Sequence, residues 1–391
     1  MCRYSSRLPW SFYPNDYTRA VCAKRATGIS LLDLTESNPT VVGFSYPHEA
    51  IAAIYGSIED LTYAPEPLGP ARARNAVCDY YAARGVSITP DRIALTASTS
   101  EAYSVLFKLF CDPGDEILVP VPSYPLFEYL AALESIRVLN YHLRYDGSWH
   151  IDFEHLEQAI TDRTRAIITV NPNNPTGSFV KLREGEQLVR IATDHGLPLI
   201  SDEVFMDYTL MDRQPRRSLA DFDSTLIFSL NGLSKLAAMP QMKLGWIAMN
   251  GPRAELEQVR ARLELILDTY LSVGTPVQQA AADLLRIGET LQAEIKVRTR
   301  MNLDAAHREL ASSAAHVLRA EGGWSAIIQL PRVFSEQEWV ARLLEQAAVV
   351  VQPGYFFDMG TEAYIVVSLI SDPVVFAEGI ARIGQVLQKE C

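Results

Sequence analysis

Cysteine and histidine are scarce in this chain of 391 residues, and neither is clustered. The five cysteines are Cys2, Cys22, Cys78, Cys111 and Cys391, and no two form a Cys-x-x-Cys pair. Such scatter favours free thiols in a reducing compartment over a disulfide framework. The seven histidines are equally dispersed, so the sequence predicts no metal site. The reducing compartment indicated by the cysteines is consistent with a cytoplasmic location, which the absence of a signal-like apolar segment also favours.

Long hydrophobic runs and basic clusters are also missing. No stretch is apolar enough to span a bilayer, and the N-terminal MCRYSSRLPWSFYPND lacks the continuous apolar segment of a signal peptide. The formal net charge is −12 at pH 7, and no basic stripe is present that would attract nucleic acid. We therefore expect no membrane or nucleic-acid partner.

The composition is that of a packed globular protein, with 48% hydrophobic and 21% charged residues. Short apolar runs alternate with helical patterns between residues 93 and 250, which predicts an α/β fold with a largely parallel sheet covered by helices on both faces. The seven expected strands are Ile93–Thr96, Glu116–Pro120, Arg137–His142, Arg165–Val170, Pro198–Ser201, Thr225–Leu230 and Leu244–Asn250.

After Gly251 the pattern is mainly helical to about Ala320, and two strands are expected near Ala326–Leu330 and Tyr364–Leu369. This change of pattern predicts two domains. A large α/β domain would comprise residues 46–272, and a smaller α+β domain would combine residues 1–45 with residues 273–391.

Four polar motifs follow expected strands: TASTSEA (96–102), NPNNPTG (171–177), SDEVF (201–205) and SLNGLSK (229–235). In an open α/β sheet, loops at the carboxyl ends of strands build the functional site. We therefore expect these four motifs to meet at one edge of the sheet.

The combination resembles the class I and II aminotransferases of fold type I, of the aspartate and alanine aminotransferase kind. LTESNPT, YAPEPLGPARAR, PVPSYPLF and PGYFF extend the resemblance over nearly the whole chain. It implies a pyridoxal 5'-phosphate (PLP) cofactor and a homodimer with shared active sites. It also implies ping-pong transfer of an amino group from an amino acid or related amine to a keto acid.

The resemblance assigns three residues to the reacting part of the cofactor. Lys235 would form the Schiff base and then carry protons, which a surface lysine would not do. Asp202 follows the apolar PLIS, where an unpaired carboxylate is costly, and would pair with a protonated pyridine nitrogen rather than act as a helix N-cap. Asn174 would donate to the ring oxygen, the alternative being an ordinary loop residue.

Further residues would hold the rest of the cofactor. Ser98, Thr99 and Ser100 open an expected helix, where backbone N–H groups bind phosphate and where simple capping is the alternative. Tyr124 would stack on the ring, unless it is a core tyrosine. Tyr63 would reach the phosphate in the neighbouring subunit. By the same resemblance, the cofactor-binding set also includes Ser234, Lys243 and Phe205.

The chain departs from the family pattern at three positions. Lys243 stands where an arginine usually forks onto the phosphate, so charge is kept and bidentate geometry is lost. Phe205 replaces the usual tyrosine. The C-terminal YIVVSLI (364–370) lacks the arginine of the usual Tyr-Ile-Arg-Leu-Ser, which binds the substrate carboxylate.

The missing arginine leaves two accounts open. Either another arginine binds the substrate carboxylate, or the amine donor carries no α-carboxylate in that place. The candidates in the first account are Arg3, Arg7, Arg25 and Arg332. Phe205, Trp246 and Tyr355 or Phe356 hint at an apolar pocket for a bulky side chain.

Two other functions remain open at this point. PLP directs which bond breaks through the orientation of the substrate, so a lyase, decarboxylase or racemase on the same fold is one alternative. A non-catalytic PLP-binding protein is the other.

The phenylalanine at position 205 should affect the pKa of the Schiff base. Because Phe205 offers no hydroxyl to the ring oxygen, the Schiff base should keep its proton to higher pH than in tyrosine-bearing relatives. The Phe205→Tyr variant should therefore lower the pKa of the Schiff-base absorbance band in a pH titration. An unchanged or raised pKa in the variant would refute this reading.

Overall fold

The computed structural model describes residues 2–10, 12–60, 62–211, 217–360 and 363–391. Within these residues the largest feature is a sheet of eight strands in the order β2-β9-β8-β7-β6-β3-β4-β5. The strands are β2 (Ile93–Thr96), β3 (Glu116–Val121), β4 (Arg137–Tyr145), β5 (Trp149–Ile151), β6 (Thr164–Val170), β7 (Leu199–Asp202), β8 (Ile227–Gly232) and β9 (Gly245–Asn250).

The sheet is mostly parallel, as the sequence predicts. Strands β8, β7, β6, β3 and β4 pair in parallel, whereas β9 is antiparallel to both β8 and β2. The expected number of strands, seven, is wrong by one. The additional strand, β5, pairs antiparallel with β4 through a hairpin that matches Tyr145 with Trp149. A run of three residues is too short to display the alternation that identifies a strand in a sequence.

Helices cover both faces of this sheet, and alternate residues of each strand enter different cores. Ile117 packs on the face with α4, α5 and α9, whereas Leu118 packs on the opposite face with α6 and α7. This arrangement explains why the strands read as continuous apolar runs. The helices are α3 (Ala71–Ala82), α4 (Thr99–Phe110), α5 (Phe127–Leu133), α6 (Phe153–Ala159), α7 (Leu182–His195) and α9 (Arg253–Tyr270).

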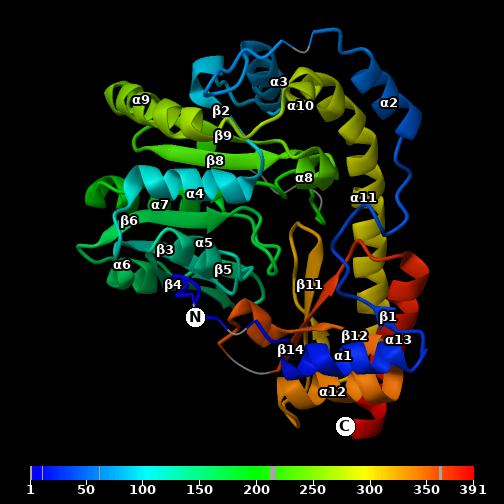
Figure 1. Cartoon of the computed structure of the whole chain (residues 1–391). Helices are drawn as coiled ribbons and strands as arrows, with labels where there is room; N and C mark the ends of the chain where they lie inside the picture. The colour runs from blue at the N-terminus through cyan, green and yellow to red at the C-terminus, as the bar shows by residue number, and fades with distance from the viewer. Residues whose placement is uncertain (1, 11, 61, 212–216, 361–362) are drawn as a thin grey trace.

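A second, smaller body contains the C-terminus (Figure 1), whereas the first described residues of the chain lie against α5, where Trp10 contacts Tyr129. The antiparallel sheet of the smaller body has the order β10-β11-β14-β13, and the N-terminal strand β1 pairs in parallel with β12. The strands are β1 (Leu32–Asp33), β10 (His316–Val317), β11 (Ser325–Gln329), β12 (Val349–Val350), β13 (Gln352–Pro353) and β14 (Tyr364–Ser368). The two strands expected in this region, here β11 and β14, are therefore confirmed.

Five further helices lie outside the group that accompanies the large sheet. They are α1 (Asp16–Ala26), α2 (His48–Gly56), α10 (Thr275–Gln279), α12 (Glu336–Ala347) and α13 (Pro373–Glu390). Within the described residues, no helix is both long enough and apolar enough to cross a bilayer.

Helix α11 (Ala281–Leu310) runs along the side of the molecule, from α3 and α10 to α13 (Figure 1). The expectation of helix to about Ala320 is wrong at its end, because the helix stops at Leu310 and β10 follows. At 30 residues it is about 45 Å long. One helix thus contributes Leu284 and Leu291 to the core beside the large sheet, and Leu310 to the core of the smaller body.

Helix α11 approaches the segment after Lys235 so closely that it requires a glycine. A Cβ at Gly288 would lie 2.4 Å from the Cβ of Ala237 and 2.8 Å from its Cα. In contrast, a Cβ at Gly384 on α13 would meet its nearest atom at an ordinary 3.6 Å.

These contacts predict opposite effects for two glycine substitutions. Gly288→Ala should lower the free energy of unfolding by about 1–3 kcal/mol, because overpacking must displace backbone. The matched Gly384→Ala should be neutral or raise it by up to about 1 kcal/mol, because alanine favours helix. Urea unfolding measures both, and equal stability of Gly288→Ala and the parent protein would contradict the packing described.

Candidate active site

The carboxyl ends of β2, β3, β6, β7 and β8 lie at one edge of the large sheet, where the predicted motifs meet. Asp202 is the last residue of β7 and pairs with Val170 of β6 and Leu230 of β8. Because β9 is antiparallel to β2 and β8, its first residue lies at the same edge, where Gly245 pairs with Thr96. The sheet alone therefore brings together residues that are separated by more than a hundred positions.

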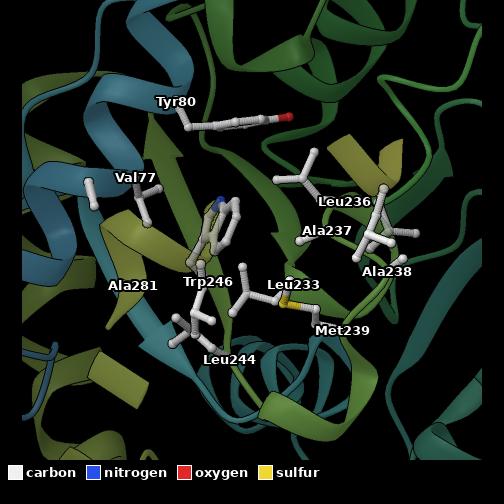
Figure 2. Packing of buried hydrophobic residues seen from close by; sticks show 14 of the residues in the cluster. Val77, Tyr80, Leu233, Leu236, Ala237, Ala238, Met239, Leu244, Trp246 and Ala281 are labelled. Atoms are coloured by element: carbon white, nitrogen blue, oxygen red, sulfur yellow. The ribbon is translucent and has the colours of Figure 1, made fainter. Parts of the chain in front are cut away.

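Lys235 lies in α8 (Leu233–Leu236), a single turn that follows β8 directly. Two leucines of the same turn are buried in the core between β9, α3 and α11, where Leu233 is 0% and Leu236 4% exposed (Figure 2). The hydroxyl of Tyr208 also donates to the Lys235 carbonyl at 2.7 Å. The backbone of Lys235 is thus fixed from both sides.

The same core corrects one expectation about the substrate pocket. Trp246 is fully buried among Val77, Tyr80 and Leu244 (Figure 2). Its indole Nε1 donates to the hydroxyl of Tyr81 at 3.4 Å. Trp246 is therefore a core residue and does not line the site.

The Lys235 amine lies in a desolvated, aromatic environment. Its Nζ is 5.1 Å from the centroid of the Trp324 ring and 5.9 Å from that of Phe205. Burial lowers the pKa of the Lys235 amine, and the negative charge of Asp202 opposes that shift. Lowering the pKa raises the neutral, nucleophilic fraction of the amine at a given pH.

Asp202 is the counterpart of this amine. Burial raises the pKa of Asp202 to about 6, although hydrogen bonds and the charge of Lys235 favour its ionised form. The backbone N–H of Val204 donates to Oδ1 at 3.2 Å, and the hydroxyl of Tyr103 donates to Oδ2 at 3.1 Å. A cationic ligand group beside the carboxyl would stabilise its charge further.

Asn174 lies between the large sheet and the smaller body. Its Oδ1 accepts a hydrogen bond from Ser325 Oγ, at the start of β11, at 3.0 Å. The contact fixes the side chain in place, so Asn174 is more than an unconstrained loop residue. Its predicted donation to a cofactor oxygen stays a prediction.

The N-terminus of α4 lies at the same edge, beside the start of β9. Ser98 is the N-cap and accepts from the Glu101 N–H, while Thr99 and Ser100 form the first turn. Lys243 stands two residues before Gly245, is exposed, and has a left-handed backbone with φ of 51°. Backbone N–H groups at a helix N-terminus suit a phosphate, and a phosphate-binding role for Lys243 stays a prediction.

The remaining predicted residues differ in their surroundings. Ser234 is half-buried beside Lys235, and Tyr124 follows β3 with a side chain that is 51% exposed. Tyr63 is 72% exposed and lines a surface cavity of 430 Å³ with Pro65, Arg72 and Gln278. Lys235 is not part of that lining, so Tyr63 does not join the other residues within one chain.

The segment YIVVSLI, which lacks the arginine of the family pattern, lies largely in β14. Val366 pairs with Ile327 across β14 and β11, two residues along from the Ser368–Ser325 pair, so both pairs share one face. Val366 is 1% exposed and packs with Trp149 and Phe357. Apolar side chains therefore surround the position at which the family pattern has a cation.

The four candidate arginines have different environments. Arg25 pairs with Asp33, and Arg7 donates to the Leu133 carbonyl at 3.0 Å. Arg3 and Arg332 are exposed. A role for any of them toward a substrate carboxylate stays a prediction.

Three residues of the site escaped sequence reasoning: Tyr103, Tyr208 and Trp324. Trp324 is 3% exposed and packs edge-on against Phe205 and Tyr208 at centroid distances of 5.2 and 5.0 Å. In the sequence each of them looks like an ordinary buried aromatic residue. Only the tertiary fold brings their polar atoms or ring faces to the site.

The chain matches a known protein family over most of its length. The family model described as aminotransferase class I and II matches residues 30–373. The chain belongs to the class I and II aminotransferases. Members of this class depend on PLP.

Individual relatives of this chain are similar over part of their length. Glutamate-pyruvate aminotransferase AlaA of Escherichia coli strain K12 is 31% identical over 255 residues, which are 65% of this chain and 63% of AlaA. S-alkyl-thiohydroximate lyase SUR1 of Arabidopsis thaliana is 30% identical over 269 residues, 66% of this chain and 57% of SUR1. The matched region therefore spans less than two thirds of either relative.

A solved structure extends the similarity to the whole chain. Alanine aminotransferase from Pyrococcus furiosus superposes with a TM-score of 0.88 at 26% identity, covering 99% of this chain and 100% of that protein. The fold of type I predicted from the sequence is therefore confirmed.

The raised pKa of Asp202 gives a prediction for the cofactor-free protein. A carboxyl whose folded pKa exceeds its unfolded value stabilises the fold below the unfolded pKa, and this contribution is lost as pH rises through about 6. Asp202→Asn removes a buried charge, so it should raise the free energy of unfolding at pH 7.5 by on the order of 1–3 kcal/mol. The gain should disappear toward pH 4.

Asp115 offers a control of opposite sign. A hydrogen bond from the Asp112 backbone and the neighbouring Arg165 lower the pKa of Asp115, so its contribution is present at neutral pH and lost on acidification. Asp115→Asn should therefore destabilise the protein at pH 7.5. Urea unfolding at several pH values tests the pair, and a destabilised Asp202→Asn at pH 7.5 would contradict the assigned burial cost.

Proposed function

We propose that this chain is a PLP-dependent transaminase that moves an amino group from an amino acid or related amine to a keto acid by a ping-pong mechanism. The observation that carries the proposal is the desolvated Lys235 amine beside Asp202 at the carboxyl edge of the sheet. Family membership supports the same activity.

The polar and aromatic groups of the site suit this cofactor. The Lys235 amine suits an aldehyde, the Asp202 carboxylate a protonated ring nitrogen, and the N-terminus of α4 with Lys243 a phosphate. Tyr124 presents an exposed ring face, and Asn174 an amide. When bound, PLP would supply an aldehyde that captures an amine and a ring that delocalises the electrons released at the substrate carbon.

Lys235 would then have two tasks. Its Nζ would hold the aldehyde end of the cofactor, and the same atom would take up a proton at the substrate carbon and return it. Trp324 and Phe205 keep water away from this Nζ, while buried Leu233 and Leu236 hold its backbone still. Asp202 would hold the positive charge of a protonated ring nitrogen.

The names of the relatives favour small amino acids as donors. AlaA is named for glutamate and pyruvate, and the Pyrococcus protein for alanine. We therefore propose alanine and glutamate as the first donors to test, with pyruvate and 2-oxoglutarate as acceptors.

A lyase is the second candidate, because two observations favour it. SUR1 is named as a lyase. In addition, buried Val366 takes the place of the cation that would orient a substrate carboxylate. Without that orientation, a different bond of the substrate could face the reacting ring.

We also propose a homodimer and a division into two domains. Exposed Tyr63, on a cavity that does not include Lys235, suits a role in the site of a second copy. The pairing of β1 with β12 supports a smaller domain made of residues 1–45 and 273–391, beside a large domain of residues 46–272.

The activity test uses the PLP-loaded protein with a panel of amino acids, simple amines and keto acids, and quantifies both products by mass spectrometry. Amino transfer predicts a new amino acid and a new keto acid in equal amounts. Lys235→Ala should lower the rate by at least about 100-fold, whereas Lys389→Ala, at the exposed end of α13, should retain it.

Other product patterns would change the conclusion. Ammonia, carbon dioxide or a cleaved side chain released without an acceptor would identify a lyase or decarboxylase, and an inverted amino acid a racemase. Equal activity of Lys235→Ala and the parent would remove Lys235 from the reaction.

A further inference from the structure

The carboxyl of Asp202 accepts a hydrogen bond from a side chain far away in the sequence. Besides the local N–H of Val204, the donor is the hydroxyl of Tyr103, 3.1 Å from Oδ2. The cofactor-binding set predicted from the sequence did not include Tyr103. It lies on α4, the helix whose N-terminus forms the candidate phosphate site.

The position of the Tyr103 ring leaves its hydroxyl little freedom. The side chain is 1% exposed. Its ring packs at a right angle to Phe127, at a centroid distance of 5.3 Å, and at 5.9 Å from Phe107. A buried tyrosine that is held in this way keeps its hydroxyl aimed at one acceptor.

We infer that Tyr103 is a positioning residue that keeps Asp202 ionised and oriented toward the cofactor ring nitrogen. A hydroxyl that donates to a carboxylate stabilises its charged form. Without this bond, burial would favour the protonated carboxyl, which cannot pair with a cationic nitrogen. The inference rests on the proposed PLP-dependent function.

The inference gives α4 a double task. Ser98, Thr99 and Ser100 at its start face the candidate phosphate site, and Tyr103, one turn further, holds the partner of the ring nitrogen. One rigid element thereby sets the spacing between the two ends of the cofactor site. Because both groups lie on one helix, little conformational freedom is lost when the cofactor binds, which lowers the entropic cost of binding.

Few ionisable groups act on Asp202. Tyr103 of α4 and Lys235 of α8 both favour its charged form. The adjacent Glu203 is turned to the other side, where Ser218 Oγ and the Leu219 N–H donate to it at 2.7 and 3.0 Å. A change at Tyr103 should therefore alter the titration of Asp202 directly.

The test measures binding of pyridoxamine 5'-phosphate to cofactor-free protein between pH 5.5 and 8.5, by equilibrium dialysis. This probe has the ring nitrogen and the phosphate of PLP but no aldehyde, so it cannot bond covalently to Lys235. The ionisable groups of the free probe titrate in the same way whichever variant is tested, so a difference between variants reports on the protein. The parent should lose affinity as pH falls through about 6, where Asp202 becomes protonated.

Tyr103→Phe removes the hydroxyl and keeps the ring. It should weaken binding about tenfold at pH 7.5 and move the loss of affinity to higher pH. Tyr141→Phe is the matched control. Tyr141 is also fully buried, but its hydroxyl donates to the Ile168 carbonyl at 2.8 Å and not to Asp202.

Each outcome is decisive. A shifted pH profile in Tyr103→Phe alone, with thermal melting like that of Tyr141→Phe, supports the inference. Identical profiles for the parent and both variants would overturn it and leave the proposed function standing. Failure of the parent to bind the probe would overturn the proposed cofactor site, and this inference with it.

Discussion

The structure depends on one electrostatic constraint, which is that an amine and a carboxylate must stay close together where little water reaches them. Burial acts on both groups, lowering the pKa of Lys235 and raising that of Asp202, while their mutual attraction opposes both shifts. Such a pair is costly for the fold and useful for a reaction, because a cationic ligand relieves the cost when it binds.

Much of the surrounding fold serves to hold this pair. The parallel strands β7 and β8 set the spacing between Asp202 and the turn that carries Lys235. The turn itself is anchored by buried Leu233 and Leu236, and α11 packs against Ala237 without room for a Cβ on Gly288. A rigid, apolar support behind two polar groups is what preorganised catalysis requires.

The strongest periodic patterns made most of the large sheet predictable from the sequence. All seven expected strands exist, because continuous apolar runs between helical patterns identify a buried parallel sheet. Strand β5 was missed because three residues show no period, and Trp246 was placed in the pocket because sequence gives no direction to a side chain. Lys235 and Asp202 lie in local motifs, which is why the sequence alone could propose them as site residues.

Tyr103 could not be found in that way, since its partner Asp202 lies 99 positions along the chain. The environment of Val366 was hidden for the same reason. The absence of arginine was visible in the sequence, but the packing against Trp149 and Phe357 arises from separate parts of the chain. Contacts between distant segments are set by topology, which motif spacing does not encode.

The central claim is that the Lys235 amine is the group that captures the cofactor aldehyde. Borohydride reduction of the PLP-incubated protein, followed by proteolysis and mass spectrometry, tests it directly. The account predicts one pyridoxyl phosphate group per chain, on the peptide that contains Lys235. Modification spread over other lysines, or absent from Lys235, would contradict it.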